Sequence, residues 1–178
     1  MPYPEIIVKP MREELTRAGV IELRDAASVD AAFAGSEGKT QLLIINSICG
    51  CAAANARPAV IKSRQAGAQP DEFLTVFAGQ DLDATDRVRE HLAGIPPSSP
   101  FIALFRDGDP VFVLERRHIE GRSGNELAEA LISSYEKFCG KKTSGSEEKP
   151  RSDTESQLAV ADPGESSSEL PPTFRSIL

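Results

Sequence analysis

This sequence contains fewer positively charged than negatively charged residues. Its 178 residues include 20 lysines and arginines against 27 aspartates and glutamates, so the formal net charge is −7. A protein that binds nucleic acid needs a basic surface to neutralise phosphates, and electrostatic attachment to an anionic membrane needs clustered basic residues. The composition therefore argues against both nucleic acid and a membrane surface as partners.

Long hydrophobic runs and abundant cysteines are also missing. No stretch approaches the roughly 20 apolar residues of a membrane-spanning helix, and the first five residues, MPYPE, lack the pattern of a secretory signal peptide. The 3 cysteines are too few for a secreted disulfide scaffold. We therefore expect a protein of the reducing cytoplasm, where paired cysteines are more often catalytic or metal-binding than structural.

The composition changes after residue 139. Residues 140–178 are rich in serine, proline, lysine and glutamate and contain few apolar side chains. Such a segment cannot bury enough surface to offset the entropy lost on ordering. We expect residues 1–139 to fold as one domain and residues 140–178 to form a disordered polar tail.

Hydrophobic patterns within residues 1–139 predict alternating helices and strands. A first helix should begin near Pro10 and end before Gly19, and Pro58 should kink or restart the helix that follows the cysteines. A last helix should open at the capping box of Ser123 and Glu126. Further helices are expected at 26–34, 52–65 and 83–92, and strands at 41–46, 73–77, 101–105 and 111–114.

The order of these elements predicts the fold class. Strands that alternate with helices early in the chain require parallel pairing, whereas the turn at residues 106–109 predicts a hairpin of antiparallel strands. We therefore expect an α/β domain with a central mixed β-sheet flanked by helices on both faces.

Cys49 and Cys51 directly follow an apolar run that predicts a strand buried on both faces, and they stand at the predicted start of a helix. The first amides of a helix lack internal partners and carry a positive partial charge, which stabilises a thiolate and lowers its pKa. Because the thiolate is the attacking species in disulfide exchange, we predict that Cys49 is the nucleophile and Cys51 the resolving thiol. Gly50 is the only spacer, and its flexibility suits the tight ring that a disulfide between the two would form.

Other residues near the pair are candidates for substrate binding. The Ser99–Pro100 bond is predicted to be cis at the start of a strand, with an ordinary loop proline as the alternative. Asn55 and Arg57 follow the cysteines on the first helical turns. Arg57 either lowers the pKa of a cysteine, meets a carboxylate of a small thiol, or is a solvated helix residue.

The histidines and the third cysteine are weaker candidates for catalysis or metal binding. His118 is either a base or an ordinary surface residue, and Cys139 is far along the chain from the pair, which makes it a bystander. A Cys-x-Cys pair can bind a soft metal, but a tetrahedral site needs four ligands, and none of His91, His118 and Cys139 lies at a recognisable ligand spacing. We therefore assign no metal and no bound cofactor, and we keep soft-metal binding as an alternative alongside a non-catalytic redox sensor.

Several segments resemble the bacilliredoxin family. They cover residues 46–58 (NSICGCAAANARP), 77–81 (FAGQD), 97–100 (PSSP), 10–15 (PMREEL) and 119–121 (IEG). The resemblance implies a thioredoxin-like fold, in which the cis proline faces the active cysteines and helps to hold a substrate strand. It also implies a thiol–disulfide oxidoreductase that removes bacillithiol from S-thiolated client proteins, with an associated disulfide isomerase activity.

The chain departs from that family in two places. The segment around His118 lacks the proline-arginine-histidine pattern associated with the family, so the resemblance carries no role over to this histidine. The segment after Cys139 has no recognised counterpart, so the resemblance predicts nothing for it.

Overall fold

The computed structural model describes residues 2–140, and these form a five-stranded mixed sheet. The strands are β1 (Ile21–Glu22), β2 (Thr40–Asn46), β3 (Glu72–Phe77), β4 (Phe101–Arg106) and β5 (Asp109–Leu114), in the spatial order β1-β3-β2-β4-β5. β1, β3 and β2 run parallel, and β4 and β5 add antiparallel strands beside β2. The predicted mixed α/β sheet is therefore confirmed. The predicted tail, residues 140–178, lies outside the described residues apart from Gly140.

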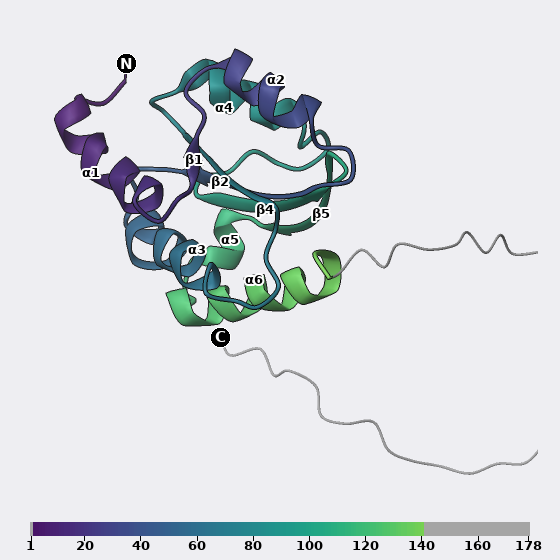
Figure 1. The fold of residues 1–178 in the computed structure, drawn as a ribbon. Helices are drawn as coiled ribbons and strands as arrows, with labels where there is room; N and C mark the ends of the chain where they lie inside the picture. The colour runs from purple at the N-terminus through teal and green to yellow at the C-terminus, as the bar shows by residue number, and fades with distance from the viewer. Residues whose placement is uncertain (1, 141–178) are drawn as a thin grey trace, which may run out of the picture. The chain divides into compact units, whose positions relative to one another are not determined.

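Helices cover both faces of the sheet (Figure 1). α2 (Ala26–Ala34) and α4 (Leu82–Glu90) pack together on one face, and α3 (Arg57–Ser63) and α6 (Gly124–Phe138) pack together on the other. Because side chains alternate along a strand, Leu43 of β2 joins the core under the first pair of helices. Its neighbour Ile44 joins the core under the second pair. β2 is thus buried on both faces, as its apolar run predicts.

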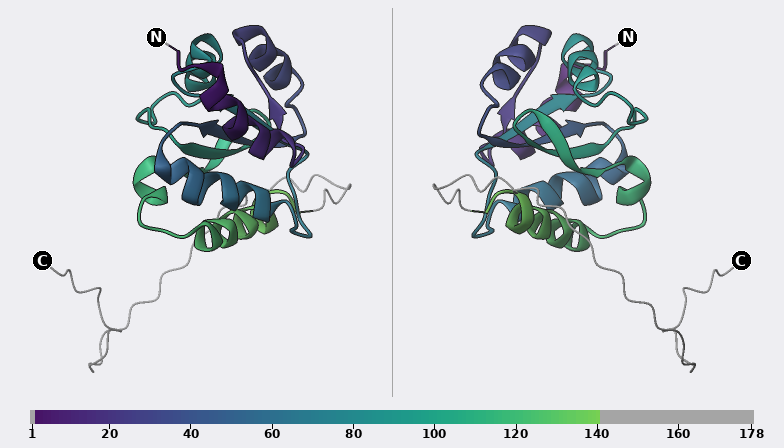
Figure 2. Two further views of the ribbon diagram at one scale, coloured as in Figure 1. Left: turned by 90° about the vertical axis from the view of Figure 1, so that its left-hand side faces the viewer. Right: turned by 90° about the vertical axis from the view of Figure 1, so that its right-hand side faces the viewer.

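The first helix differs from the sequence prediction. α1 spans Glu5–Thr16, so Pro10 lies inside it rather than at its start. A proline cannot donate to the carbonyl four residues back, which here belongs to Ile6. Ile6 is 83% exposed, so water can take the place of the missing donor at little cost. Figure 2 shows α1 lying against the edge of the sheet.

Local turn and cap predictions agree with the structure. The loop between β4 and β5 is Asp107-Gly108, and both residues have positive φ, as a tight two-residue hairpin turn requires. Ser123 caps α6, with Glu126 completing the capping box. Two elements were not predicted, β1 and the short α5 (Arg116–Ile119), because two and four residues show no hydrophobic period.

Candidate functional site

The cysteine pair lies where β2 passes into a helix. The backbone carbonyl of Cys49 accepts hydrogen bonds from the amides of Ala52 and Ala53, at 3.1 and 3.3 Å, so the helical hydrogen bonding begins at this cysteine. The first turn, Ala52–Ala56, is a wide π-helical turn, and α3 restarts the α-helical pattern at Arg57. Proline lacks an amide hydrogen, so Pro58 leaves the regular bond to Ala54 unmade and permits this restart.

The two sulfurs face each other in the reduced state. Their Sγ atoms are 2.7 Å apart, longer than the roughly 2.05 Å of a disulfide, and both thiols are free and half-buried. Ser47 Oγ donates to Cys49 Sγ at 3.3 Å, and the amide of Ala52 donates to the same sulfur at 3.4 Å. Three donors thus converge on Cys49.

These contacts separate the acidities of the two thiols. Burial raises the pKa of Cys49, but the hydrogen bonds from Cys51, Ser47 and the Ala52 amide outweigh it, so the pKa lies below its usual value. Burial and the neighbouring Cys49 raise the pKa of Cys51, against the opposing charge of Arg116. Of the two thiols, Cys49 is therefore the one that loses its proton first, and its thiolate accepts a hydrogen bond from the protonated Cys51.

The reduced structure shows no backbone strain that would require glycine at position 50. Gly50 is exposed, its φ is outside the positive range, and a Cβ built on it would meet no atom within 4 Å. The predicted need for glycine at the spacer is therefore not visible in the reduced structure. Any such need must come from the disulfide ring, where the backbone between the cysteines is more constrained.

A groove beside the pair opens Cys49 to solvent. It has a volume of about 340 Å³, within the range of small-molecule sites. Its walls come from six segments of the chain, and besides Cys49 they consist of Tyr3, Ser47, Ile48, Ala78, Gly79, Arg89, Ser99 and Arg116. We call this the Cys49 groove.

The predicted cis proline is present in the structure. The Ser99–Pro100 bond is cis, as predicted, and it immediately precedes β4. Pro100 is buried, whereas Ser99 lines the Cys49 groove. The proline-rich loop thus contributes Ser99 to the lining of the groove.

Arg57 and Asn55 do not line the Cys49 groove. Arg57 is only 2% exposed, so its prediction as a solvated helix residue is wrong. Its guanidinium donates to Glu14 at 2.7 Å, to the side-chain oxygen of Asn46 at 3.1 Å and to the carbonyl of Ser47 at 3.3 Å. The arginine therefore holds the end of β2 in place just before the cysteines. Asn55 is half-buried on the π-helical turn.

His118 and Cys139 lie apart from the Cys49 groove. Nδ1 of His118 accepts a hydrogen bond from the amide of Glu115 at 3.1 Å and so caps α5. Cys139 ends α6 and contacts Thr40, the first residue of β2, whereas the reactive pair follows the last residue of that strand. Burial raises the pKa of Cys139, which leaves it a weaker nucleophile near neutrality than Cys49.

Three groove residues escaped the sequence analysis: Tyr3, Arg89 and Arg116. They come from the segment before α1, the last turn of α4 and the start of α5, and nothing local in the sequence marks them. Only the fold brings them together.

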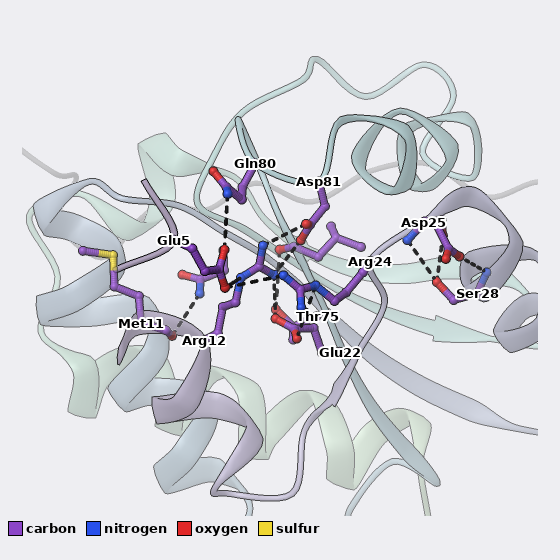
Figure 3. A network of polar contacts seen from close by, with 12 residues as sticks. Glu5, Met11, Arg12, Glu22, Arg24, Asp25, Ser28, Thr75, Gln80 and Asp81 are labelled. Atoms are coloured by element: carbon purple, nitrogen blue, oxygen red, sulfur yellow. Dashed lines mark hydrogen bonds and ion pairs between the residues drawn. The ribbon is translucent and has the colours of Figure 1, made fainter. Parts of the chain in front are cut away.

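A buried ion-pair network around Arg12 joins α1 to β1 and to the loop before α4 (Figure 3). Arg12 of α1 donates to both carboxylate oxygens of Asp81, at 2.7 and 2.8 Å, and to Glu22 of β1 at 2.6 Å. The backbone amide of Tyr3 donates to the side chain of Gln80 at 2.8 Å. These bonds tie α1 to the loop before α4, and so they set where the N-terminal wall of the groove lies.

Within residues 2–140, no three histidine, cysteine or acidic side chains are grouped so that they could hold a metal ion. Nor does that part of the chain contain a helix long and apolar enough to cross a membrane.

The mixed sheet, its helical layers, the cis proline and the thiol pair at a helix start define a thioredoxin-like domain with a reduced Cys-Gly-Cys site. Residues 3–139 match the family model described as disulphide isomerase. A bacilliredoxin of Salinibacter ruber is 57% identical over 178 residues, covering 99% of both chains, and one of Koribacter versatilis is 45% identical over 78% of this chain and 94% of its own. The chain belongs to the bacilliredoxin family.

Further similar proteins include a relative that spans the C-terminal segment and two solved thioredoxin structures. A second Salinibacter ruber bacilliredoxin is 51% identical over 178 residues, so the segment after residue 139 has counterparts in relatives, contrary to our expectation. Among solved structures, a Halobacterium salinarum thioredoxin variant matches with a TM-score of 0.47 at 15% identity, covering 68% of this chain and 92% of its own. A Fasciola hepatica thioredoxin matches with a TM-score of 0.44 at 14% identity, covering 65% and 99%.

Proposed function

We propose that this protein is a thiol–disulfide oxidoreductase that removes a low-molecular-weight thiol, bacillithiol, from mixed disulfides on client proteins. The observation that carries the proposal is the opposite shift of two facing thiols: the pKa of Cys49 is lowered and that of Cys51 is raised, and the Cys49 groove leaves the more acidic sulfur accessible. Membership of the bacilliredoxin family supports the same chemistry.

Catalysis would begin with the Cys49 thiolate attacking the small-thiol sulfur of the client's mixed disulfide. The client sulfur leaves as a thiolate and takes up a proton, while Cys49 now carries the small thiol as a new mixed disulfide. No net oxidation has occurred at this point, because one disulfide has replaced another. The client leaves with its cysteine restored.

Two routes would then free the enzyme. Cys51 can lose its proton and attack Cys49, which forms the Cys49–Cys51 disulfide and expels the small thiol as a thiolate. Alternatively, a second molecule of small thiol attacks the bound one, leaves as a symmetric disulfide with it, and restores reduced Cys49. The first route requires a thiol reductant to reopen the small Cys-Gly-Cys ring, and neither route uses a bound cofactor.

The same site would support disulfide isomerisation. A small strained ring is reduced more easily than a relaxed disulfide, which makes the pair a poor reductant and a better exchanger. We place the reaction in the cytoplasm, where client thiols are kept reduced and a mixed disulfide is a lesion to be repaired.

Single-cysteine variants test this proposal. We expect Cys49→Ser to abolish release of client thiol, and Cys51→Ser to complete one attack and then hold the small thiol on Cys49, where intact mass measures it. Cys139→Ser is the matched control and should keep full turnover. Loss of all attack in Cys51→Ser together with normal attack in Cys49→Ser would reverse the roles. A wild-type protein that reacts once, without repeated turnover in the presence of reductant, would indicate a sensor rather than an enzyme.

A further inference from the structure

A second and mostly apolar pocket lies beside the Cys49 groove. Its floor is formed by three side chains of the core under α2 and α4, each almost fully buried: Ile45, Leu92 and Phe101. Arg89 and the loop residues 93–98 form its rim, and the pocket has a volume of about 190 Å³. We call it the proline-loop pocket.

Polar groups are scarce around the proline-loop pocket. Among the described residues that line it, only Arg89 is charged, and Ser98 is the only other one with a polar side chain. Pro96 and Pro97 on the rim have a restricted backbone and no amide hydrogen, so the rim offers few donors and is shaped before any ligand arrives. A preformed apolar concavity of this kind is typical of a binding site.

The proline-loop pocket is adjacent to the site of the reaction. Arg89 lines both the pocket and the Cys49 groove, and Ser98 of the pocket directly precedes Ser99 of the groove. A client whose modified cysteine reaches Cys49 therefore presents its neighbouring residues to this pocket. Since an extended chain advances by at most about 3.6 Å per residue, side chains within about three residues of the cysteine lie close enough to enter.

Size and polarity decide what kind of group fits. The volume of about 190 Å³ is below the range of about 300–1,000 Å³ that holds a whole small-molecule ligand. An apolar cavity of about 150 Å³ takes a benzene ring, so one leucine or phenylalanine side chain fits here. A freely soluble small thiol carries polar groups that this lining leaves without hydrogen-bond partners. Both properties therefore favour a single apolar side chain of the client.

We infer that the proline-loop pocket selects among client proteins by taking a large apolar side chain that lies within about three residues of the modified cysteine. This inference rests on the proposed function, and it concerns the client rather than the small thiol. The sulfur chemistry at Cys49 is unchanged by it. The pocket raises the rate of attack only for clients whose sequence places an apolar side chain in reach.

Peptides that carry one leucine at different positions test the inference. Each peptide has a single cysteine joined to 2-mercaptoethanol in a background of alanine and serine, with leucine at one of the three positions before or after the cysteine. The measured quantity is the second-order rate constant for attack by reduced protein in a single turnover. We expect leucine at one or two positions to raise it about tenfold over the leucine-free peptide, because the pocket removes the side chain from water. A similar rise at every position, or no rise at any, would overturn the inference.

Two variants change the pocket in opposite directions. Ala93 is exposed on the rim, so Ala93→Trp should fill the opening, leave the core intact and abolish the leucine effect. Ile95 is half-buried in the lining, so Ile95→Ala should enlarge the pocket and shift the preference from leucine to phenylalanine. Ala31→Trp is the matched control, because Ala31 is exposed on α2 and lines neither cavity.

The control should keep the full leucine effect. A leucine effect that Ala93→Trp leaves unchanged, or that Ala31→Trp removes as well, would overturn the inference. An unchanged order of leucine and phenylalanine in folded Ile95→Ala would do the same. If Ile95→Ala does not fold, as circular dichroism would show, Ala93→Trp decides alone.

Other occupants of the pocket would give different results. A second copy of this chain would make the leucine effect fall as the protein concentration rises. The chain's own C-terminal apolar residues would hide the effect until Phe174 and Ile177 are both replaced by serine. Either result would overturn the inference.

Competition for Cys49 in Cys51→Ser protein separates this inference from the proposed function. The favoured leucine peptide and the leucine-free peptide are supplied as thiols together with their symmetric disulfides. The Cys49 thiolate attacks a peptide disulfide, one peptide leaves as a thiolate, and intact mass gives the share of each peptide that remains on Cys49. A leucine preference here, without release of client thiol from small-thiol mixed disulfides, would refute the proposed function alone. Repeated turnover without the preference would refute this inference alone.

Discussion

Replacing Arg57 with methionine should both destabilise the protein and weaken its nucleophile. The side chain is buried and joins Glu14 to the end of β2, where it donates to Asn46 and to the carbonyl of Ser47. Methionine fills much of the same space but donates no hydrogen bond. The substitution therefore isolates the polar contacts from the packing.

The structure sets the size of the effect. The side-chain oxygen of Asn46 still accepts a hydrogen bond from the amide of Ser47 at 2.8 Å. Losing the bond from Arg57 to this oxygen therefore costs little free energy of unfolding. The carbonyl of Ser47 loses its arginine partner, which costs about 1–2 kcal/mol. Glu14 is 44% exposed, so the broken ion pair adds only about 1 kcal/mol. We expect the free energy of unfolding to fall by about 2–3 kcal/mol in total.

Urea unfolding and thiol alkylation together measure this outcome. Glu14→Gln is the matched control, because glutamine still offers an oxygen to Arg57, and it should cost about 1 kcal/mol or less. Because Ser47 also donates to Cys49, Arg57→Met should raise the pKa of Cys49, whereas Glu14→Gln should not. Unchanged stability with a raised KM for mixed disulfides would refute this reasoning and favour Arg57 as a substrate-binding residue, one of the roles considered from the sequence.

Two further predictions concern the site and the hairpin. Cys51→Ala removes the donor to Cys49 and should raise the pKa of Cys49, because a hydrogen bond to the thiolate is lost. Cys51→Ser keeps a donor and should raise this pKa less, and equal pKa values of Cys49 in the alkylation profiles of the two variants would contradict the prediction. Gly108 has a φ of 86°, and a Cβ there would meet Ser36 Oγ at 2.9 Å, so Gly108→Ala should cost about 1–3 kcal/mol in urea unfolding, mainly through the strained backbone. Gly50→Ala should leave the reduced fold within about 0.5 kcal/mol, and a cost like that of Gly108→Ala would show hidden strain at the spacer.

The parts of the site that depend on adjacent residues were predictable. Cys49 follows a run of apolar residues and precedes strong helix formers, so its place at a strand-to-helix junction could be deduced from a short stretch of sequence. The cis bond before Pro100 and the turn at Gly108 were predictable for the same reason, since each depends on two or three neighbours.

The parts that depend on distant residues were not predictable. Arg57 looked like a solvated helix residue or a ligand for substrate because its partner Glu14 lies 43 positions earlier in the chain. Arg89 and Arg116 lie on two separate helices, and only the packing of α4 and α5 around the sheet brings them to one groove. Long-range convergence of this kind leaves no periodic or compositional signal.

The acidity of the two active-site thiols is the property on which the mechanism depends. Alkylation by iodoacetamide as a function of pH, resolved by mass for each cysteine, gives both pKa values in the folded protein and again in urea. Because the thiolate of Cys49 accepts hydrogen bonds that the unfolded chain lacks, its pKa should be lower in the folded protein than in urea, while that of Cys51 should be higher. A folded-state pKa of Cys49 equal to or above its value in urea, or a Cys51 that ionises first, would contradict the mechanism.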